Sequence, residues 1–179
     1  MNRNTDTSMI KEATSPRPVI LESQTRIRFD HCDPFGHLNN SAFLNYFQNA
    51  REDQVEEAYG LDIHAFFRKT GRAWVVGQNQ IVYLHPAVVR ELVTIQTSII
   101  RVSDTSMLVE HLMLDEKKEV LKSVLWTKFV YIDVRKTARA THEPELMQLF
   151  EEVVCKEETS EVFEERVKQL RSQHQPIAK

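Results

Sequence analysis

The residues of this chain that could do chemistry lie close together in residues 33–40, which read DPFGHLNN. This stretch holds a carboxylate in Asp33, an imidazole in His37 and two amides in Asn39 and Asn40. A carboxylate can attack an activated carbonyl or take a proton from the water that attacks it. Asn is a favoured N-cap residue, and a helix that starts there presents unpaired N–H groups. These groups can hold an oxyanion, so the stretch suits hydrolysis of an activated acyl group.

The same residue types also make ordinary turns. Pro34 favours an extended backbone at Asp33, and Gly36 can adopt the positive φ that lets a chain reverse direction. Asp33 could therefore serve only as the Asx residue of a structural turn. The segments on either side of the stretch bear on this choice.

A strand and two helices are predicted around this loop. Residues 19–30 alternate polar and apolar side chains over part of their length, which predicts a strand. Residues 40–59 have a helical stripe, closed by Gly60, and residues 63–70 predict a short helix that ends at Gly71. The stripe of the long helix consists of Phe43, Tyr46, Phe47 and Ala50. In the short helix we expect Phe66 and Phe67 to face inward.

The remaining chain predicts four more strands and two more helices. Runs rich in β-branched and aromatic residues predict strands over 73–84, 92–102, 107–114 and 120–134, joined by short polar links. A helical stripe follows Pro144, formed by Leu146, Leu149, Phe150, Val153 and Val154. Residues 159–173 carry a further stripe of Val162, Phe163, Val167 and Leu170. The order predicts an α+β domain in which one helix packs on a curved antiparallel sheet.

Composition narrows the class of protein. The chain has 179 residues, 41% of them apolar, which suits one globular domain. Its net charge of −3, without a basic stripe, argues against a nucleic-acid partner. No signal peptide or membrane span is apparent. The two cysteines, Cys32 and Cys155, form neither a disulfide framework nor a zinc pattern. We therefore expect a soluble cytoplasmic protein without cofactor or metal.

The residues around this loop resemble a known family. The resemblance is carried by residues 28–40 and 42–51, and it is supported by 81–87 and 131–133. Over roughly residues 22–150 the chain resembles hotdog-fold acyl-CoA thioesterases of the 4-hydroxybenzoyl-CoA thioesterase type. The resemblance implies a helix wrapped by a five-stranded antiparallel sheet. It also implies a homodimer or homotetramer with active sites at the dimer interface.

The same resemblance implies roles for single residues. Asp33 matches the family's catalytic carboxylate, as nucleophile or general base, and the backbone N–H at or beside Asn40 matches its oxyanion donor. We expect His37 to act beside them, and Phe35, Asn39 and Tyr46 to contact the acyl-CoA substrate. The chain departs from the family at Arg90 and Glu91, where Gly-Asp is frequent, so we expect a different turn there.

Other residues offer competing assignments. Glu52 and Glu56 lie on the predicted long helix, and a related branch of thioesterases uses a helix glutamate. Cys32 beside His31 could form a nucleophile pair, although adjacent residues of an extended chain face opposite ways. His37 could equally be a structural loop residue.

Two function classes remain open from the sequence. The first is an acyl-CoA thioesterase and the second is a non-catalytic acyl-CoA-binding scaffold of the same fold, since fold does not fix function. The predicted organisation is a flexible leader over 1–18, a thioesterase domain over 19–155 and a helical extension over 156–179. We expect the extension to pack through its apolar stripe without taking part in chemistry.

Overall fold

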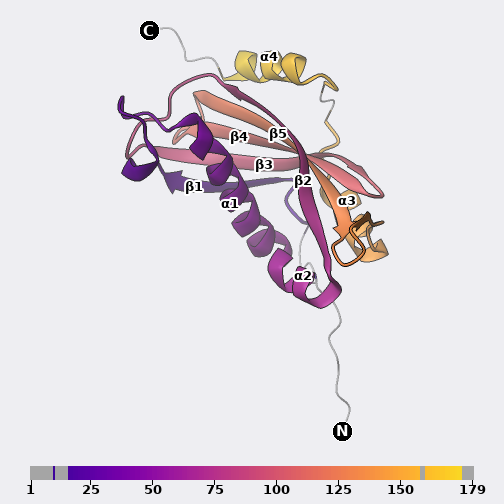
Figure 1. Ribbon diagram of the computed structural model, residues 1–179. Helices are drawn as coiled ribbons and strands as arrows, with labels where there is room; N and C mark the ends of the chain where they lie inside the picture. Colours follow the sequence, from indigo (N-terminus) through magenta and orange to yellow (C-terminus); the bar gives the residue numbers. More distant parts are fainter. Residues whose placement is uncertain (1–9, 11–15, 158–159, 175–179) are drawn as a thin grey trace.

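A curved antiparallel sheet wraps around one long helix in the computed structural model of this protein (Figure 1). The structure describes residue 10, residues 16–157 and residues 160–174. The sheet has five long strands in the order β1-β3-β4-β5-β2, and every neighbouring pair is antiparallel. The strands are β1 (Ile20–Arg26), β2 (Arg72–Tyr83), β3 (Leu92–Ser103), β4 (Ser106–Asp115) and β5 (Leu121–Asp133). A two-residue strand, β6 (Ala138–Arg139), pairs with the end of β5.

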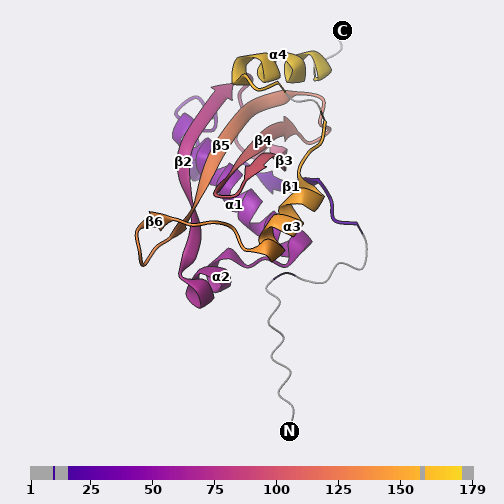
Figure 2. The ribbon, with the colours of Figure 1, turned by 90° about the vertical axis from the view of Figure 1, so that its right-hand side faces the viewer.

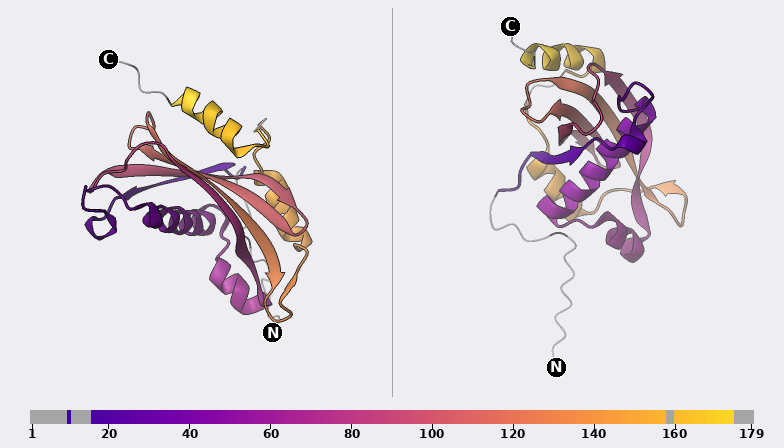
Figure 3. Two further views of the ribbon diagram at one scale, coloured as in Figure 1. Left: turned by 45° about the horizontal axis from the view of Figure 1, so that its top comes forward. Right: turned by 90° about the vertical axis from the view of Figure 1, so that its left-hand side faces the viewer.

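The helices lie on both faces of this sheet. The left view of Figure 3 shows α1 (Asn40–Tyr59) under the concave face and α4 (Phe163–Gln173) over the opposite, convex face. α2 (Ile63–Thr70) follows α1 and leads into β2, and α3 (Pro144–Val153) follows β6. Figure 2 shows β2 beside β5 at the outer edge of the sheet.

Alternation along the strands separates the two faces. In β4, Val109 and Met113 join the apolar clusters that contain α1, whereas Leu112 joins the cluster that contains α4. Side chains two residues apart share a face of a strand, which accounts for this division. The α1 stripe that the sequence predicts is fully buried, and Phe47 is completely enclosed. Apolar side chains are therefore packed against helices on both faces of the sheet.

Most predicted elements are confirmed within a residue or two. α1 spans the predicted range, and Gly60 and Gly71 end α1 and α2 with left-handed φ values of 68° and 71°. Gly77 falls at a β-bulge in β2, between Val76 and Gln78. A long helix wrapped by a five-stranded antiparallel sheet is confirmed, and this is the hotdog fold.

Three local predictions differ from the structure. The first strand ends at Arg26 rather than at residue 30, because the chain turns into a short 3₁₀ helix, η1 (Phe29–His31). Phe66 is buried as predicted, but Phe67 is 41% exposed since it lies on the outer side of the short α2 helix. The sequence also did not predict β6.

The two ends of the chain contact the folded body where they are described. Arg17 pairs with Glu152 at 2.6 Å, and the Pro18 carbonyl accepts a hydrogen bond from Tyr59 Oη. Residues 1–9 and 11–15 of the predicted leader lie outside the described residues. At the other end α4 packs through Phe163, Val167 and Leu170, so their predicted packing is confirmed. Val162 of the predicted stripe is instead 47% exposed, because it precedes the helix as its N-cap.

Candidate active site

The Asp33 loop is a tight hairpin between two bridged residues. Cys32 and Leu38 form an antiparallel bridge. Inside it the Gly36 N–H donates to the Asp33 carbonyl at 3.0 Å, and the Asp33 N–H donates to the His37 carbonyl at 2.7 Å. Gly36 has a φ of 77°, a conformation in which other residues are strained. The predicted reversal at Gly36 is therefore present.

The Asp33 side chain is held by one oxygen. Its Oδ1 accepts hydrogen bonds from the N–H groups of Phe35, at 2.9 Å, and His37, at 3.0 Å. Its Oδ2 accepts no hydrogen bond from any described residue. Asp33 can thus serve both as the Asx residue of the turn and as a reactive carboxylate, because Oδ1 fixes its orientation and Oδ2 remains available.

The two amides have different positions at the start of α1. Asn39 is the N-cap, and its Oδ1 accepts from the Ser41 N–H at 3.0 Å. Asn40 is the first helical residue, and within the described chain its N–H has no acceptor. A free N–H at the positive end of a 20-residue helix suits a developing oxyanion.

The loop is fastened to the segment between β2 and β3. The Leu38 N–H donates to the Ala87 carbonyl and the Val89 N–H donates to the Gly36 carbonyl, each at 2.8 Å. Lys122 on β5 steadies that segment in turn, since its Nζ lies 2.8 Å from Glu91 Oε1. The carboxylate is therefore positioned by three parts of the chain.

Arg90 takes a backbone conformation that favours glycine. Its φ is 66°, in the left-handed region. Arg90 thus adopts a geometry that glycine adopts without strain. The expected difference between this turn and that of the family stays a prediction. Glu91 is engaged by Lys122 and by the Val88 N–H.

Two tyrosines support the loop and the helix start. Tyr46 Oη accepts from the Arg28 N–H at 2.9 Å and lies 3.1 Å from His31 Nδ1. Tyr83 Oη donates to the Asn40 carbonyl at 3.0 Å. Sequence reasoning did not single out Tyr83, and the only signal for it was its place at the end of a strand.

Exposed apolar side chains lie on and next to the Asp33 loop. Phe35 at the tip of the loop is 83% exposed, and Phe29 is 84% exposed. Val88, which bridges to His37, is also exposed. The His37 side chain has no hydrogen-bond partner among the described residues. Asp33, His37 and the start of α1 thus belong to one surface region.

The competing residues lie elsewhere or are engaged. Glu52 is 12 residues along α1 from Asn40, about 18 Å at 1.5 Å per residue, and it pairs with His64 at 2.6 Å. Cys32 Sγ donates to the Arg28 carbonyl at 3.3 Å. Desolvation of the Cys32 thiol raises its pKa, which disfavours a thiolate nucleophile.

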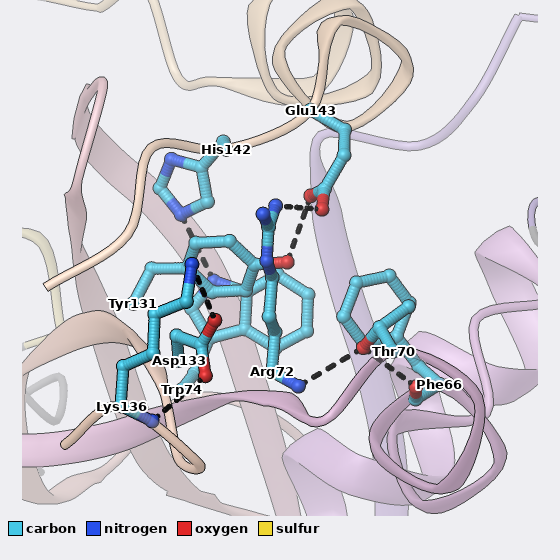
Figure 4. Close-up of polar contacts among 9 residues, drawn as sticks. All are labelled: Phe66, Thr70, Arg72, Trp74, Tyr131, Asp133, Lys136, His142 and Glu143. Atoms are coloured by element: carbon cyan, nitrogen blue, oxygen red, sulfur yellow. Dashed lines mark hydrogen bonds and ion pairs between the residues drawn. The ribbon is translucent and has the colours of Figure 1, made fainter. Parts of the chain in front are cut away.

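A second polar cluster lies at the far end of β2 and β5 (Figure 4). Glu143 accepts a hydrogen bond from Tyr131 Oη at 2.7 Å and pairs with Arg72. Trp74 Nε1 donates to His142 Nε2 at 3.0 Å, and His142 Nδ1 lies 3.1 Å from the Ser103 carbonyl. Because the polar groups of this cluster hydrogen-bond and pair with one another, we infer a structural role, in which the cluster joins the start of α3 to the sheet.

The larger of two described cavities is not at Asp33. It has a volume of about 390 Å³ on the convex face, with Arg101, Trp126 and Lys128 in its lining. We place the candidate site at Asp33 regardless, because this loop holds a carboxylate oxygen without a hydrogen-bond partner among the described residues and leads directly into a helix whose first N–H has no acceptor there. Within the described chain no three His, Cys, Asp or Glu side chains could hold a metal. Its helices include none that could span a membrane.

Known proteins share this sequence pattern and this fold. The model of the thioesterase-like superfamily matches residues 27–150. The long-chain acyl-CoA thioesterase FadM of Escherichia coli is 29% identical over 135 residues, which is 75% of this chain and 99% of that protein.

Solved structures agree with this match. The probable thioesterase YbaW from Escherichia coli has 26% identity and a TM-score of 0.65 over 75% of this chain and 99% of its own. A DHNA-CoA thioesterase from Staphylococcus aureus, at 16% identity, has a TM-score of 0.66 over 88% of this chain and 97% of its own, which supports the fold alone. With the family pattern matched over more than half of its length, the chain belongs to the thioesterase-like superfamily.

Proposed function

We propose that this protein hydrolyses the thioester of an acyl-CoA to a free acid and CoA. The observation that carries the proposal is a carboxylate, Asp33, oriented through Oδ1 with Oδ2 unpaired among the described residues, in the loop that leads into the unpaired N–H of Asn40 at the start of α1. Membership of the thioesterase-like superfamily and similarity to a long-chain acyl-CoA thioesterase support it.

Two reaction routes fit this pairing. As a general base, Asp33 takes a proton from water, and the resulting hydroxide adds to the thioester carbonyl. As a nucleophile, the carboxylate adds itself and forms a mixed anhydride, which water then cleaves. In both routes the Asn40 N–H stabilises the oxyanion, and collapse of the tetrahedral intermediate releases the CoA thiolate, which takes up a proton.

The surrounding residues have proposed roles of their own. The His37 imidazole is free to contact the thioester or to polarise water. The exposed Phe35 ring offers apolar surface to the acyl chain, and Asn39 borders the helix start. We propose that Tyr46 acts in substrate binding by holding the 28–31 segment, since its hydroxyl is already engaged there. The free cysteines are compatible with a cytoplasmic enzyme.

The test compares Asp33→Asn with Glu52→Gln and Glu56→Gln in an assay of thiol release from short, long and aromatic acyl-CoAs. Asp33→Asn should lower kcat about 10²-fold or more, as removal of a general base typically does, while acyl-CoA binding survives. The two glutamate variants should stay near wild type. If a glutamate variant loses activity and Asp33→Asn does not, the assignment is wrong. Binding without any turnover would favour the scaffold alternative.

A further inference from the structure

Three arginines gather beside the Asp33 loop, and we call Arg26, Arg28 and Arg90 the arginine strip. Arg26 Nη1 donates to the Arg90 carbonyl at 2.7 Å. The Arg90 N–H donates to the Ile27 carbonyl at 2.9 Å, which joins the 88–91 turn to the end of β1. The preceding residue of that turn bonds Gly36 of the Asp33 loop. Two backbone hydrogen bonds, one to Ile27 and one to Gly36, therefore connect the turn that carries Arg90 with the end of β1 and with the Asp33 loop.

The strip faces solvent. Ile27 is buried, with 1% of its surface exposed. Arg28 keeps an extended backbone, with φ −84° and ψ 143°, so alternation continues past the end of β1. Since neighbours in an extended chain point to opposite sides, Arg26 and Arg28 share the side away from the core. All three arginines are exposed.

The positive charge of the strip is not compensated locally. The guanidinium groups of Arg28 and Arg90 make no ion pair or hydrogen bond with any described residue. The neighbouring Glu91 is engaged by Lys122 and by the Val88 N–H. The exposed Asp30 carboxylate lies 3.8 Å from His31 Nε2. Two cations are thus left for a ligand in a chain whose net charge is −3.

The conformation of Arg90 gives independent support. Its left-handed φ of 66° is sterically unfavourable for any residue with a Cβ, and glycine would adopt it freely. Strained backbone of this kind clusters at functional sites, and in this chain Lys118 and Thr137 also adopt a positive φ in turns. An arginine kept in a glycine conformation beside a candidate active loop points to a use for its side chain.

We propose that Arg28 and Arg90, with Arg26 buttressing the turn, bind the phosphate groups of the CoA moiety while the thioester reaches Asp33. This proposal rests on the proposed function. Guanidinium groups suit the task, because their planar fork donates two hydrogen bonds to one phosphate. The long pantetheine arm of CoA separates its phosphates from the thioester, so the cations belong on the rim rather than at the carboxylate.

A rival location is the convex-face cavity, which contains Arg101 and Lys128. Arg101 is already engaged there, since it lies 5.5 Å from the centre of the Trp126 ring and its Nη2 donates to the Ser160 carbonyl at 3.2 Å. The arginine strip is the better candidate because it adjoins the Asp33 loop.

The test uses two thioesters of the same acyl group, the acyl-CoA and the acyl-N-acetylcysteamine thioester, which lacks phosphates. The variants are Arg28→Gln and Arg90→Gly, the second chosen because glycine keeps the turn. Arg139→Gln, an exposed arginine on β6, is the matched control, and Lys128→Gln tests the rival cavity. Each strip variant should raise KM for the acyl-CoA about fivefold or more, with kcat unchanged. Neither constant should change for the short thioester, and Arg28→Lys should restore part of the loss.

Several results would overturn the proposal. They are an unchanged KM in both strip variants, an equal rise in KM for both thioesters, or an effect of Lys128→Gln alone. If the wild type hydrolyses no thioester, the proposed function fails, and the strip is then judged by calorimetric binding of CoA itself. Weaker CoA binding in the strip variants but not in Arg139→Gln would still support it, and equal binding in all variants would refute it.

Discussion

Arg166 on α4 forms a bidentate ion pair with Glu110 in the middle of the sheet. Its Nη2 donates to Oε1 at 2.8 Å and its Nε donates to Oε2 at 2.9 Å. Both side chains are enclosed, with 13% and 3% of their surfaces exposed. Trp126 Nε1 donates to the same carboxylate at 2.9 Å. The family pattern ends at residue 150, so this pair fastens a helix outside that pattern to the convex face.

Arg166→Ala should lower the free energy of unfolding by about 3 kcal/mol, because it leaves a buried carboxylate without its counter-ion. Urea unfolding measures the change. Lys168→Ala, an exposed position on the same helix, is the control and should cost less than about 0.5 kcal/mol. The double variant Glu110→Leu/Arg166→Leu should recover much of the loss, since it removes both charges. Equal stability of Arg166→Ala and Lys168→Ala would contradict the role of the pair.

Asn40→Pro isolates the proposed oxyanion donor. Proline is well tolerated at the first helical position and has no N–H. Asn39 already has the extended backbone, with φ −61° and ψ 137°, that a following proline requires. Turnover of acyl-CoA should fall about 10²-fold or more, with the melting temperature little changed. Asn40→Ala, which keeps the N–H, should stay near wild type. If both variants have wild-type kcat, the oxyanion is held elsewhere.

The turn at Arg90 makes a prediction about stability. Arg90→Gly should be more stable than Arg90→Ala by about 1 kcal/mol, because only alanine retains the Cβ penalty of the left-handed conformation. Chemical unfolding of the two variants measures the difference. The reverse order would mean that the turn does not hold this conformation in solution.

Two buried histidines make stability depend on pH. Burial, followed by the charge of Arg51, lowers the pKa of His111 to about 3, and burial lowers the pKa of His142. The unfolded chain binds these protons at a pKa of about 6.5, so below that pH it holds more protons than the folded chain. The free energy of unfolding should therefore fall as pH drops from 7 to 5, with His111 contributing up to about 1.4 kcal/mol per pH unit.

His111→Leu tests this pH dependence. The variant removes the larger of the two effects and keeps an apolar contact with Phe47, whose ring centre lies 5.6 Å from that of His111. Its stability should vary less between pH 7 and pH 5, as measured by urea unfolding at both values. An unchanged slope would mean that His111 is protonated in the folded protein.

The free edge of β2 predicts self-association. Val75 and Val76 are exposed on this outer strand, and unpaired strand edges readily pair with another chain. We expect a homodimer or larger homo-oligomer in sedimentation at micromolar concentration. Replacing both valines with lysine should shift it toward the monomer, whereas the same change at the exposed Val134 should not. A wild-type monomer of about 21 kDa would contradict the prediction.

Local pattern by itself determined much of this protein. The α1 stripe, the glycines that end α1 and α2 and the apolar face of α4 are each readable from neighbours within a few residues, because helix and strand periodicity is local. The same holds for the Asp33 turn, whose Pro34 and Gly36 act over one or two residues. The α+β class follows from the order of these elements.

Only the tertiary structure decided how distant residues meet. No spacing indicates that Arg166 reaches Glu110, 56 residues away, or that Tyr83 bonds the start of α1, 43 residues away. These contacts depend on strand register and on which face of the sheet each helix covers. The hydrogen bond from Arg26 to the Arg90 carbonyl, 64 residues later, likewise depends on the tertiary structure. The residues of the candidate loop could therefore be identified from the sequence. The distant residues that hold this loop in place could be identified only from the tertiary structure.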